Sequence, residues 1–151
     1  LAIIGKSIWL KSKVKLRRRY KGCRNRINNN TNRRGTNLGM DIEEIREYCL
    51  SKEASSESMP FDDKTLVFKV YTKMFALVSL EKNLTINLKC QTEDILKLKE
   101  EYPAIKEGYH MNKKHWITVT VNETITPQFL SFLIDNSYNL VKANVPKKYL
   151  K

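Results

Sequence analysis

Glycine and cysteine are both scarce in this 151-residue chain, and each scarcity excludes a class of protein. Gly108 is the only glycine beyond residue 39, so that region holds no glycine-rich phosphate loop and no G-x-S-x-G nucleophile elbow. The three cysteines, Cys23, Cys49 and Cys90, show no C-x-x-C spacing and are too few for a disulfide framework. We therefore expect Cys49 and Cys90 to be reduced core residues of a cytoplasmic protein.

Long apolar runs and metal-ligand clusters are also missing. No stretch approaches the ~20 apolar residues that a membrane-spanning helix needs, so we expect no membrane partner. The two histidines, His110 and His115, lie five positions apart, which would put them on opposite faces of a strand. Asp62 and Asp63 are adjacent and would diverge, so they do not form an acid–base pair. These patterns predict a binding protein with no metal or other cofactor, and not an enzyme.

Positive charge is unevenly distributed along the chain. The formal net charge is +12, from 28 basic and 16 acidic residues. Residues 1–39 contain 12 of the basic residues and no acidic one, which leaves 16 of each sign in residues 40–151. Whole-chain charge is therefore no evidence that the folded part binds nucleic acid.

The leader, residues 1–39, has three possible interpretations: a basic tail that binds polyanions, an organelle-type presequence, or translated DNA upstream of the true start. We favour the last, because a short Arg-Arg-Gly segment that a purine-rich ribosome-binding sequence could encode stands just before Met40. The leader is then disordered or extraneous. Residues 40–151 are expected to form the folded domain.

Hydrophobic periodicity predicts seven elements after the leader. They are a helix capped by Asp41 that ends near Ser51, strands at 65–71, 73–80 and 85–90, a helix capped by Thr92 and limited by Pro103, a strand at 116–121, and a helix capped by Thr126 that ends near Pro146. The polar segment 51–58 is expected to be a loop. This order predicts an α+β fold in two layers, a mainly antiparallel sheet with helices packed on one face.

The other face of this sheet is expected to be open, and strand alternation predicts which side chains it presents. These are Lys69, Tyr71, Lys89, Trp116, Thr118 and Thr120, whereas Phe68, Val70, Ile86, Leu88, Ile117 and Val119 are expected to face the helices. With Lys73, the lysines on these strands could form a basic stripe. Alternatively, they only prevent strand-to-strand aggregation.

Several segments closely resemble the MmcQ/YjbR family of small bacterial proteins. They include Pro-Phe at 60–61, Leu-Val-Phe-Lys-Val at 66–70, Asp-Asn-Ser-Tyr at 135–138 and, most specifically, Tyr-His-Met-Asn-Lys-Lys-His-Trp at 109–116. The resemblance extends from Met40 to about Val145 and leaves the leader outside. It implies a CyaY-like two-layer fold, described as a double wing, and a DNA-binding function.

The segment from Tyr109 to Trp116 is the richest in groups that bind ligands. We predict a nucleic-acid site made of Lys69, Lys73, Lys89, His110, Asn112, Lys113, Lys114, His115 and Trp116, with phosphate contacts from the polar groups and stacking on Trp116. A neutral domain can bind DNA this way only if its acidic helices lie behind the sheet. Two alternatives stay open: Tyr109 and Trp116 only anchor a loop, or the face binds a protein or a metabolite.

Overall fold

The structure, a computed structural model, describes residues 39–150. The chain divides into two units, residues 1–36 and residues 37–151, and only the second is described below. The expectation for the leader therefore lies, apart from Gly39, outside the described residues, as does Cys23. None of the helices in the described part is long and apolar enough to cross a membrane.

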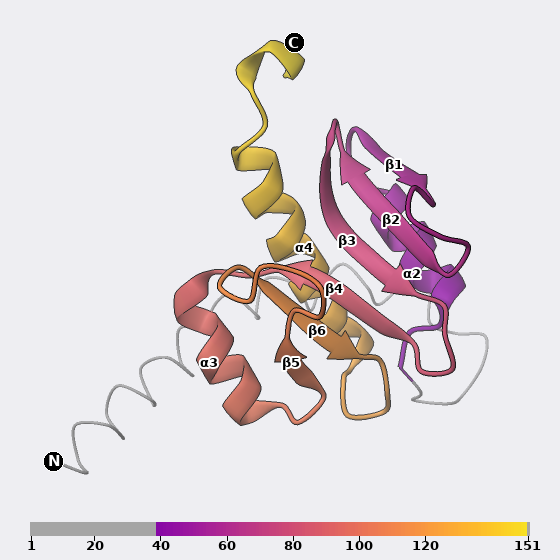
Figure 1. The fold of residues 1–151 in the computed structure, drawn as a ribbon, viewed down its shortest axis with the longest axis vertical. Helices are drawn as coiled ribbons and strands as arrows, with labels where there is room; N and C mark the ends of the chain where they lie inside the picture. The colour runs from indigo at the N-terminus through magenta and orange to yellow at the C-terminus, as the bar shows by residue number, and fades with distance from the viewer. Residues whose placement is uncertain (1–38, 151) are drawn as a thin grey trace, which may run out of the picture. The chain divides into compact units, whose positions relative to one another are not determined.

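The described residues form a six-stranded sheet with three α-helices and a short 3-10 helix (Figure 1). In chain order the elements are α2 (Ile42–Leu50), β1 (Ser55–Ser58), β2 (Thr65–Val70), β3 (Lys73–Ser79), β4 (Thr85–Lys89), α3 (Thr92–Glu101), β5 (Ile105–Glu107), β6 (Trp116–Thr120), α4 (Pro127–Ala143) and η1 (Lys147–Tyr149). The strand order is β1-β2-β3-β4-β6-β5, and every neighbouring pair is antiparallel. This architecture confirms the predicted α+β fold.

Helix α2 begins where the sequence predicts, because Asp41 and Glu44 cap each other. The Asp41 carboxylate accepts a hydrogen bond from the Glu44 backbone N–H at 2.9 Å, and the Glu44 carboxylate accepts one from the Asp41 N–H at 2.9 Å. This box satisfies backbone donors that the first helical turn leaves without partners. Beyond it, Ile45 and Cys49 form the buried side of the helix.

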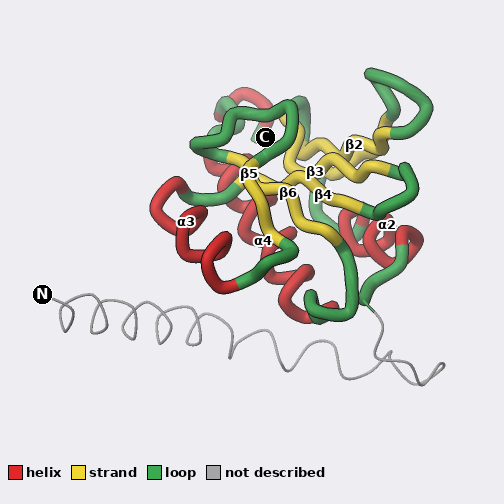
Figure 2. Tube along the Cα trace, turned by 60° about the horizontal axis from the view of Figure 1, so that its bottom comes forward, coloured by secondary structure: helices red, strands yellow, loops and turns green. Residues whose placement is uncertain are grey.

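The strand register separates the sheet's side chains into two faces, because directly paired residues point to the same side. One face carries an apolar row of Val78, Ile86 and Val119 and, beside it, a second row of Ala76, Leu88 and Ile117. Helix α4 packs on this face across β2, β3 and β4, and α2 packs on β1, so that both helices lie on one side of the strands (Figure 2). We call the face away from α4 the open face. It is not bare throughout, since Val67 and Leu77 lie on it and are buried.

Strand β3 contains a bulge at Phe75. The pairing of β2 with β3 steps from Phe68 opposite Ala76 to Lys69 opposite Met74, so Phe75 is an extra residue. An extra residue reverses the alternation of the strand on one side of it. The bulge therefore decides which face each residue at the start of β3 occupies.

Ser137 of α4 closes the gap that the bulge leaves in the hydrogen-bond ladder. Its hydroxyl donates to the Phe75 carbonyl at 2.5 Å and accepts from the Lys89 backbone N–H at 2.8 Å. Its neighbour Tyr138 packs edge-on against the Phe75 ring, with the ring centroids 5.3 Å apart. These contacts join α4, β3 and β4 at one point.

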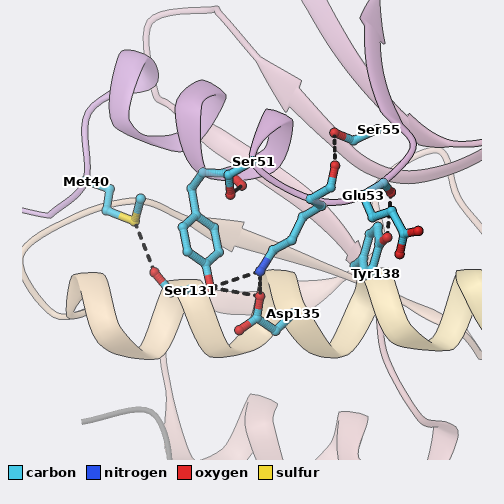
Figure 3. A network of polar contacts seen from close by, with 9 residues as sticks. Met40, Ser51, Glu53, Ser55, Ser131, Asp135 and Tyr138 are labelled. Atoms are coloured by element: carbon cyan, nitrogen blue, oxygen red, sulfur yellow. Dashed lines mark hydrogen bonds and ion pairs between the residues drawn. The ribbon is translucent and has the colours of Figure 1, made fainter. Parts of the chain in front are cut away.

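Two further polar side chains of α4 reach α2 and the turn that follows it (Figure 3). Asp135 accepts a hydrogen bond from the Tyr48 hydroxyl at 2.8 Å and forms an ion pair with Lys52. The Tyr138 hydroxyl donates to the Glu53 carbonyl at 2.6 Å. Helix α4 is thus bonded on one side to the sheet and on the other to α2.

The prediction of a loop over 51–58 is wrong for its last four residues, which form β1. The sequence of β1 is Ser-Ser-Glu-Ser, with no apolar alternation to reveal it. Its pairing with β2, Ser55 opposite Val70, defines the strand, and the Glu57 carboxylate accepts hydrogen bonds from Arg46 of α2 at 2.5 and 2.6 Å. The other edge strand, β5, was also not predicted. Both edges therefore depend on tertiary pairing.

Helix α3 starts differently from the prediction, whereas α4 starts as predicted. The N-cap of α3 is Gln91, which makes no side-chain capping bond, and Thr92 is the first residue of the helix. The Thr92 hydroxyl donates to the Lys114 carbonyl at 2.8 Å instead. At α4, the Thr126 hydroxyl accepts a hydrogen bond from the Phe129 N–H at 3.2 Å.

Candidate functional site

Two of the predicted lysines lie in one row across the open face. Lys69 of β2 pairs with Met74 of β3, and Lys89 of β4 pairs with Trp116 of β6. We call these four residues the basic row; each is partly exposed. Because β3 separates β2 from β4, the two lysines stand about 10 Å apart across the strands. The predicted placement of Lys69, Lys89 and Trp116 on this face agrees with the register.

Lys73 does not join this row. It pairs with Val70, whose side chain is on the side of α4, so Lys73 points to that side as well. Uninterrupted alternation from Ala76 would have placed Lys73 on the open face, but the extra residue Phe75 reverses it. The expectation that Lys73 contributes to an open-face stripe is wrong for this reason.

The connection between β5 and β6, residues 108–115, carries most of the other predicted residues, and we call it the β5–β6 loop. It leaves β5 at Gly108, whose backbone N–H donates to the Trp116 carbonyl at 2.9 Å. A Cβ atom at position 108 would lie 2.7 Å from the Trp116 Cβ, closer than real Cβ contacts. The close approach of the two backbones therefore requires glycine here.

The backbone of Tyr109 is fixed to the open face by two side chains of the sheet. Its N–H donates to the Thr118 hydroxyl at 2.9 Å, and its carbonyl accepts from the Asn87 side-chain amide at 3.1 Å. The Thr118 hydroxyl in turn donates to the Asn87 side-chain carbonyl at 2.6 Å. The Tyr109 ring is nevertheless 69% exposed, so Tyr109 anchors the loop through its backbone and presents its ring to solvent.

His110 follows with a backbone φ of 57°, in the left-handed region that residues other than glycine rarely adopt. Its ring lies against the ring of Tyr109, with centroids 3.9 Å apart and an angle of 54° between the planes. Both side chains are exposed. The pair therefore presents a contiguous aromatic surface.

Asn112 organises the second half of the loop. Its side-chain oxygen accepts from the Lys114 N–H at 3.0 Å, and its backbone carbonyl accepts from the N–H groups of His115 and Trp116, each at 3.0 Å. The His115 ring nitrogen Nδ1 lies 3.3 Å from the Thr92 hydroxyl at the start of α3. Asn112 therefore shapes the turn, whereas His115 and Lys114 remain exposed beside α3.

Acidic groups reach part of this surface. Glu107 of β5 accepts a hydrogen bond from Lys99 at 2.7 Å and lies 3.9 Å from the Lys113 ammonium. The bond from Lys99 and the positive charges of Lys99 and Lys113 hold the pKa of the Glu107 carboxyl below its ordinary value. Lys113 is thus partly neutralised. In contrast, none of the ion pairs within residues 39–150 involves Lys69, Lys89 or Lys114.

The acidic helices are separated from the open face only in part. Helix α2 packs on β1 on the side of α4, as expected. Helix α3 instead touches the β5–β6 loop through Thr92, so its first-turn acids Glu93 and Asp94 lie near the site. The backbone of Lys114 therefore lies beside the first turn of an acidic helix.

Both described cysteines belong to the core, as predicted. Cys49 and Cys90 are free and buried. Burial raises the pKa of each thiol to about 12, with the Asp94 charge adding to the effect at Cys90. Neither is therefore a thiolate nucleophile at neutral pH. In the described part of the chain, no three His, Cys, Asp or Glu side chains are grouped to hold a metal ion.

Sequence reasoning placed Thr118 on the open face but did not count it, or Asn87, among the site residues, and so missed that these two side chains hold the loop. Both lie at positions where alternation places polar side chains on the open face, so their exposure could be predicted. Their bonds to Tyr109 depend on the path of a loop that returns over the sheet, and no local pattern encodes that path.

Comparisons with known proteins agree on one family. The family model described as YjbR matches residues 50–140. Among curated proteins, the uncharacterised protein YbdF of Escherichia coli O157:H7 is 43% identical over 90 residues, which cover 59% of this chain and 74% of YbdF. The uncharacterised protein YjbR of Escherichia coli K12 is 28% identical over 113 residues, which cover 74% of this chain and 96% of YjbR.

Solved structures show the same architecture. The Deinococcus radiodurans protein DR2400, with the family-model domain DUF419, is 37% identical with a TM-score of 0.69, and the match covers 76% of this chain and 87% of DR2400. A Pseudomonas syringae protein is 28% identical with a TM-score of 0.59, covering 67% of this chain and 98% of that protein.

Proposed function

This chain belongs to the YjbR family, and we propose that it is a DNA-binding protein without enzymatic activity that holds DNA on its open face. The phosphate contacts come from Lys69, Lys89 and Lys114, with His110, His115 and Lys113 at the margin of the same surface. Trp116 adds aromatic area within the basic row. The thiols of Cys49 and Cys90 are free and buried, which suits a reducing compartment, and we also propose that the protein is cytoplasmic.

The observation that carries this proposal is the placement of Lys69 and Lys89 in one row, without acidic partners among residues 39–150. The register puts both on the face that α4 does not cover, and no ion pair within residues 39–150 occupies either ammonium group. A lysine paired to a carboxylate must give up that partner to bind a phosphate, whereas an unpaired lysine only releases counterions from the DNA. The row is therefore the part of the domain best suited to phosphate.

The proposed affinity is modest, because the contacts are few. Three phosphate contacts make log K fall with log salt at a slope of about −2.7 on duplex DNA and about −2 on a single strand. The first-turn acids of α3 reduce the attraction at Lys114. We therefore expect binding that is clear at low salt and weak at physiological salt.

A titration that resolves individual residues tests this proposal in the full chain. The leader holds 12 basic residues, so a bulk binding assay would report on the leader as well. Amide NMR shifts separate the two sources, since each residue reports its own surroundings. Duplex and single-stranded oligonucleotides are added at about 50 and about 200 mM salt, a range over which phosphate contacts change affinity strongly.

The matched variants remove the same charge at, or in the loops before, opposite ends of β2 and β4. Lys69→Ala with Lys89→Ala should weaken binding at the open face and flatten the salt slope by about 1.4 to 1.8. Lys64→Ala with Lys82→Ala is the control, because these exposed lysines lie next to the other ends of β2 and β4. Equal losses from both double variants would show attraction by net charge only and would refute a site at the basic row.

Shifts confined to residues 1–38 would assign DNA binding to the leader and remove the proposal for the domain. The absence of any shift in residues 39–150 at low salt would have the same consequence. In either case we would replace the proposed DNA-binding function of the open face with a protein- or metabolite-binding role.

A further inference from the structure

We infer that the open face prefers single-stranded nucleic acid to duplex, with the Tyr109–His110 ring pair as the surface on which an unpaired base stacks. This inference rests on the proposed function and specifies which form of nucleic acid the same site binds. It depends on how the β5–β6 loop presents these two rings.

The loop holds the Tyr109 backbone in a fixed position. Both backbone polar groups of Tyr109 bond to side chains of the sheet, the N–H to Thr118 and the carbonyl to Asn87. Thr118 and Asn87 also bond to each other, so each orients the other. A backbone held on both sides fixes the point from which the ring projects, so less backbone conformational entropy is lost when a ligand binds the ring.

The ring itself is left in solvent. Tyr109 is 69% exposed, whereas Phe75 of β3 is fully buried. The neighbouring His110 adopts a φ of 57° in the conformation that brings its ring to 3.9 Å from that of Tyr109. Strained backbone and exposed aromatic area at one place are typical of ligand sites.

An exposed aromatic ring discriminates between single-stranded and duplex nucleic acid. In a duplex, each base is stacked on both sides, so its flat face is not available to a protein ring. In a single strand that face is free, and stacking on an aromatic side chain is favourable for every base. Sheets that display aromatic rings bind unpaired bases in this way.

The basic row lies close enough to Tyr109 to bind the phosphates of a nucleic-acid single strand whose base stacks on the ring pair. Asn87 and Thr118, which hold Tyr109, are each two residues along their strands from Lys89 and Trp116. Two residues of a strand span about 7 Å. A ring for a base and an ammonium group for a phosphate therefore stand next to each other on the open face. The carboxylate of β5, on Glu107, forms ion pairs with Lys99 and Lys113.

The test uses the full chain with an oligothymidine of about ten nucleotides and a duplex of about ten base pairs, within the size that one sheet surface covers. Affinity is taken from the amide shifts of residues 108–118. Tyr109→Ala should weaken single-strand binding between about 5-fold and about 150-fold, the range that loss of one stacked base produces. Duplex binding should change less than twofold.

Two further variants separate stacking from hydrophobic contact. Tyr109→Phe keeps the ring and should keep the affinity, whereas Tyr109→Leu keeps apolar volume without an aromatic face and should behave like Tyr109→Ala. The matched control is Phe61→Ala, because Phe61 is an aromatic residue of similar exposure, 65%, in the β1–β2 loop. We expect this control to leave both affinities unchanged.

Failure of this inference is distinguishable from failure of the proposed function. If the duplex binds as tightly as the single strand and Tyr109→Ala changes neither, while the variants at Lys69 and Lys89 still weaken binding, stacking is refuted and DNA binding stands. If neither oligonucleotide shifts any residue of 39–150, the proposed function itself is refuted.

Discussion

Replacing Ser137 with Ala tests whether one hydroxyl holds the bulged sheet together. In the structure this hydroxyl stands where the ladder bond between β3 and β4 would otherwise run, from the Lys89 N–H to the Phe75 carbonyl. Ser137 is fully buried, so water does not easily replace it. The alanine variant leaves one backbone donor and one backbone acceptor without a partner inside the protein.

The expected cost follows from these two groups. Each buried polar group left without a partner costs about 1–3 kcal/mol, so the two groups together should lower the free energy of unfolding of Ser137→Ala by about 2–6 kcal/mol. This is a large part of the ~5–15 kcal/mol that stabilises an ordinary domain. Unfolding entropy is about 2.1 cal/mol/K per residue, so for about 110 residues the melting temperature should fall by about 9–26 °C.

Urea denaturation and hydrogen exchange together provide the assay. Urea gives the change in free energy, and the exchange rate of the Lys89 amide reports the lost bond directly, since that N–H donates to Ser137. Ser131→Ala is the matched control: Ser131 is also a buried serine of α4, but its hydroxyl bonds to the Met40 sulfur, at 3.8 Å (Figure 3). Sulfur is a weak acceptor, so this control should cost less than about 0.5 kcal/mol.

Two results would refute the reasoning. One is a loss in Ser137→Ala no larger than in Ser131→Ala, because the two hydroxyls would then be equivalent. The other is an unchanged exchange rate at Lys89 in the destabilised variant, because the loss of stability would then come from packing and not from the broken bridge.

The central strands β4 and β6 could be predicted because each buries the side chains of one face and leaves those of the other face exposed to solvent. The segments that became β4 and β6 alternate between apolar and polar residues, and their predicted limits differ from the observed ones by one residue at the C-terminal end. In β3 the four consecutive residues from Phe75 to Val78 are all buried, so alternation carries no information there. The bulge within this run was therefore invisible in the sequence, and the error at Lys73 follows from it.

The edge strands could not be predicted, for the opposite reason. Strand β1 has no apolar side chain and β5 has three residues, too short for a period to be recognised. Each forms because a neighbouring strand offers unpaired backbone groups. Local propensity is a weak guide where pairing with a distant segment decides the conformation.

The candidate site was predictable in composition but not in its internal bonding. Alternation placed Lys69, Lys89 and Trp116 on the open face, since it depends only on strand geometry. The pairing of Lys113 with Glu107 depends instead on how the β5–β6 loop folds back on β5, which is a tertiary feature. Sequence therefore indicates which charges share a face, while the structure decides which of them are neutralised.

Two remaining predictions concern the thiols and the charge of the site. Because burial raises the pKa of Cys49 and Cys90 to about 12, roughly one thiol in 10,000 is ionised at pH 8. Peptide mapping after alkylation should find both unmodified in the folded chain and modified in urea; equal labelling in the two states would contradict their burial. Glu107→Gln should strengthen DNA binding, because it frees Lys113 and steepens the salt slope by about 0.7 to 0.9. Its depressed pKa keeps the Glu107 carboxylate charged at neutral pH, so substitution is the way to remove the charge. Glu81→Gln, which removes an exposed carboxylate at the far end of the sheet, is the control, and an equal gain from both variants would mean that only net charge matters.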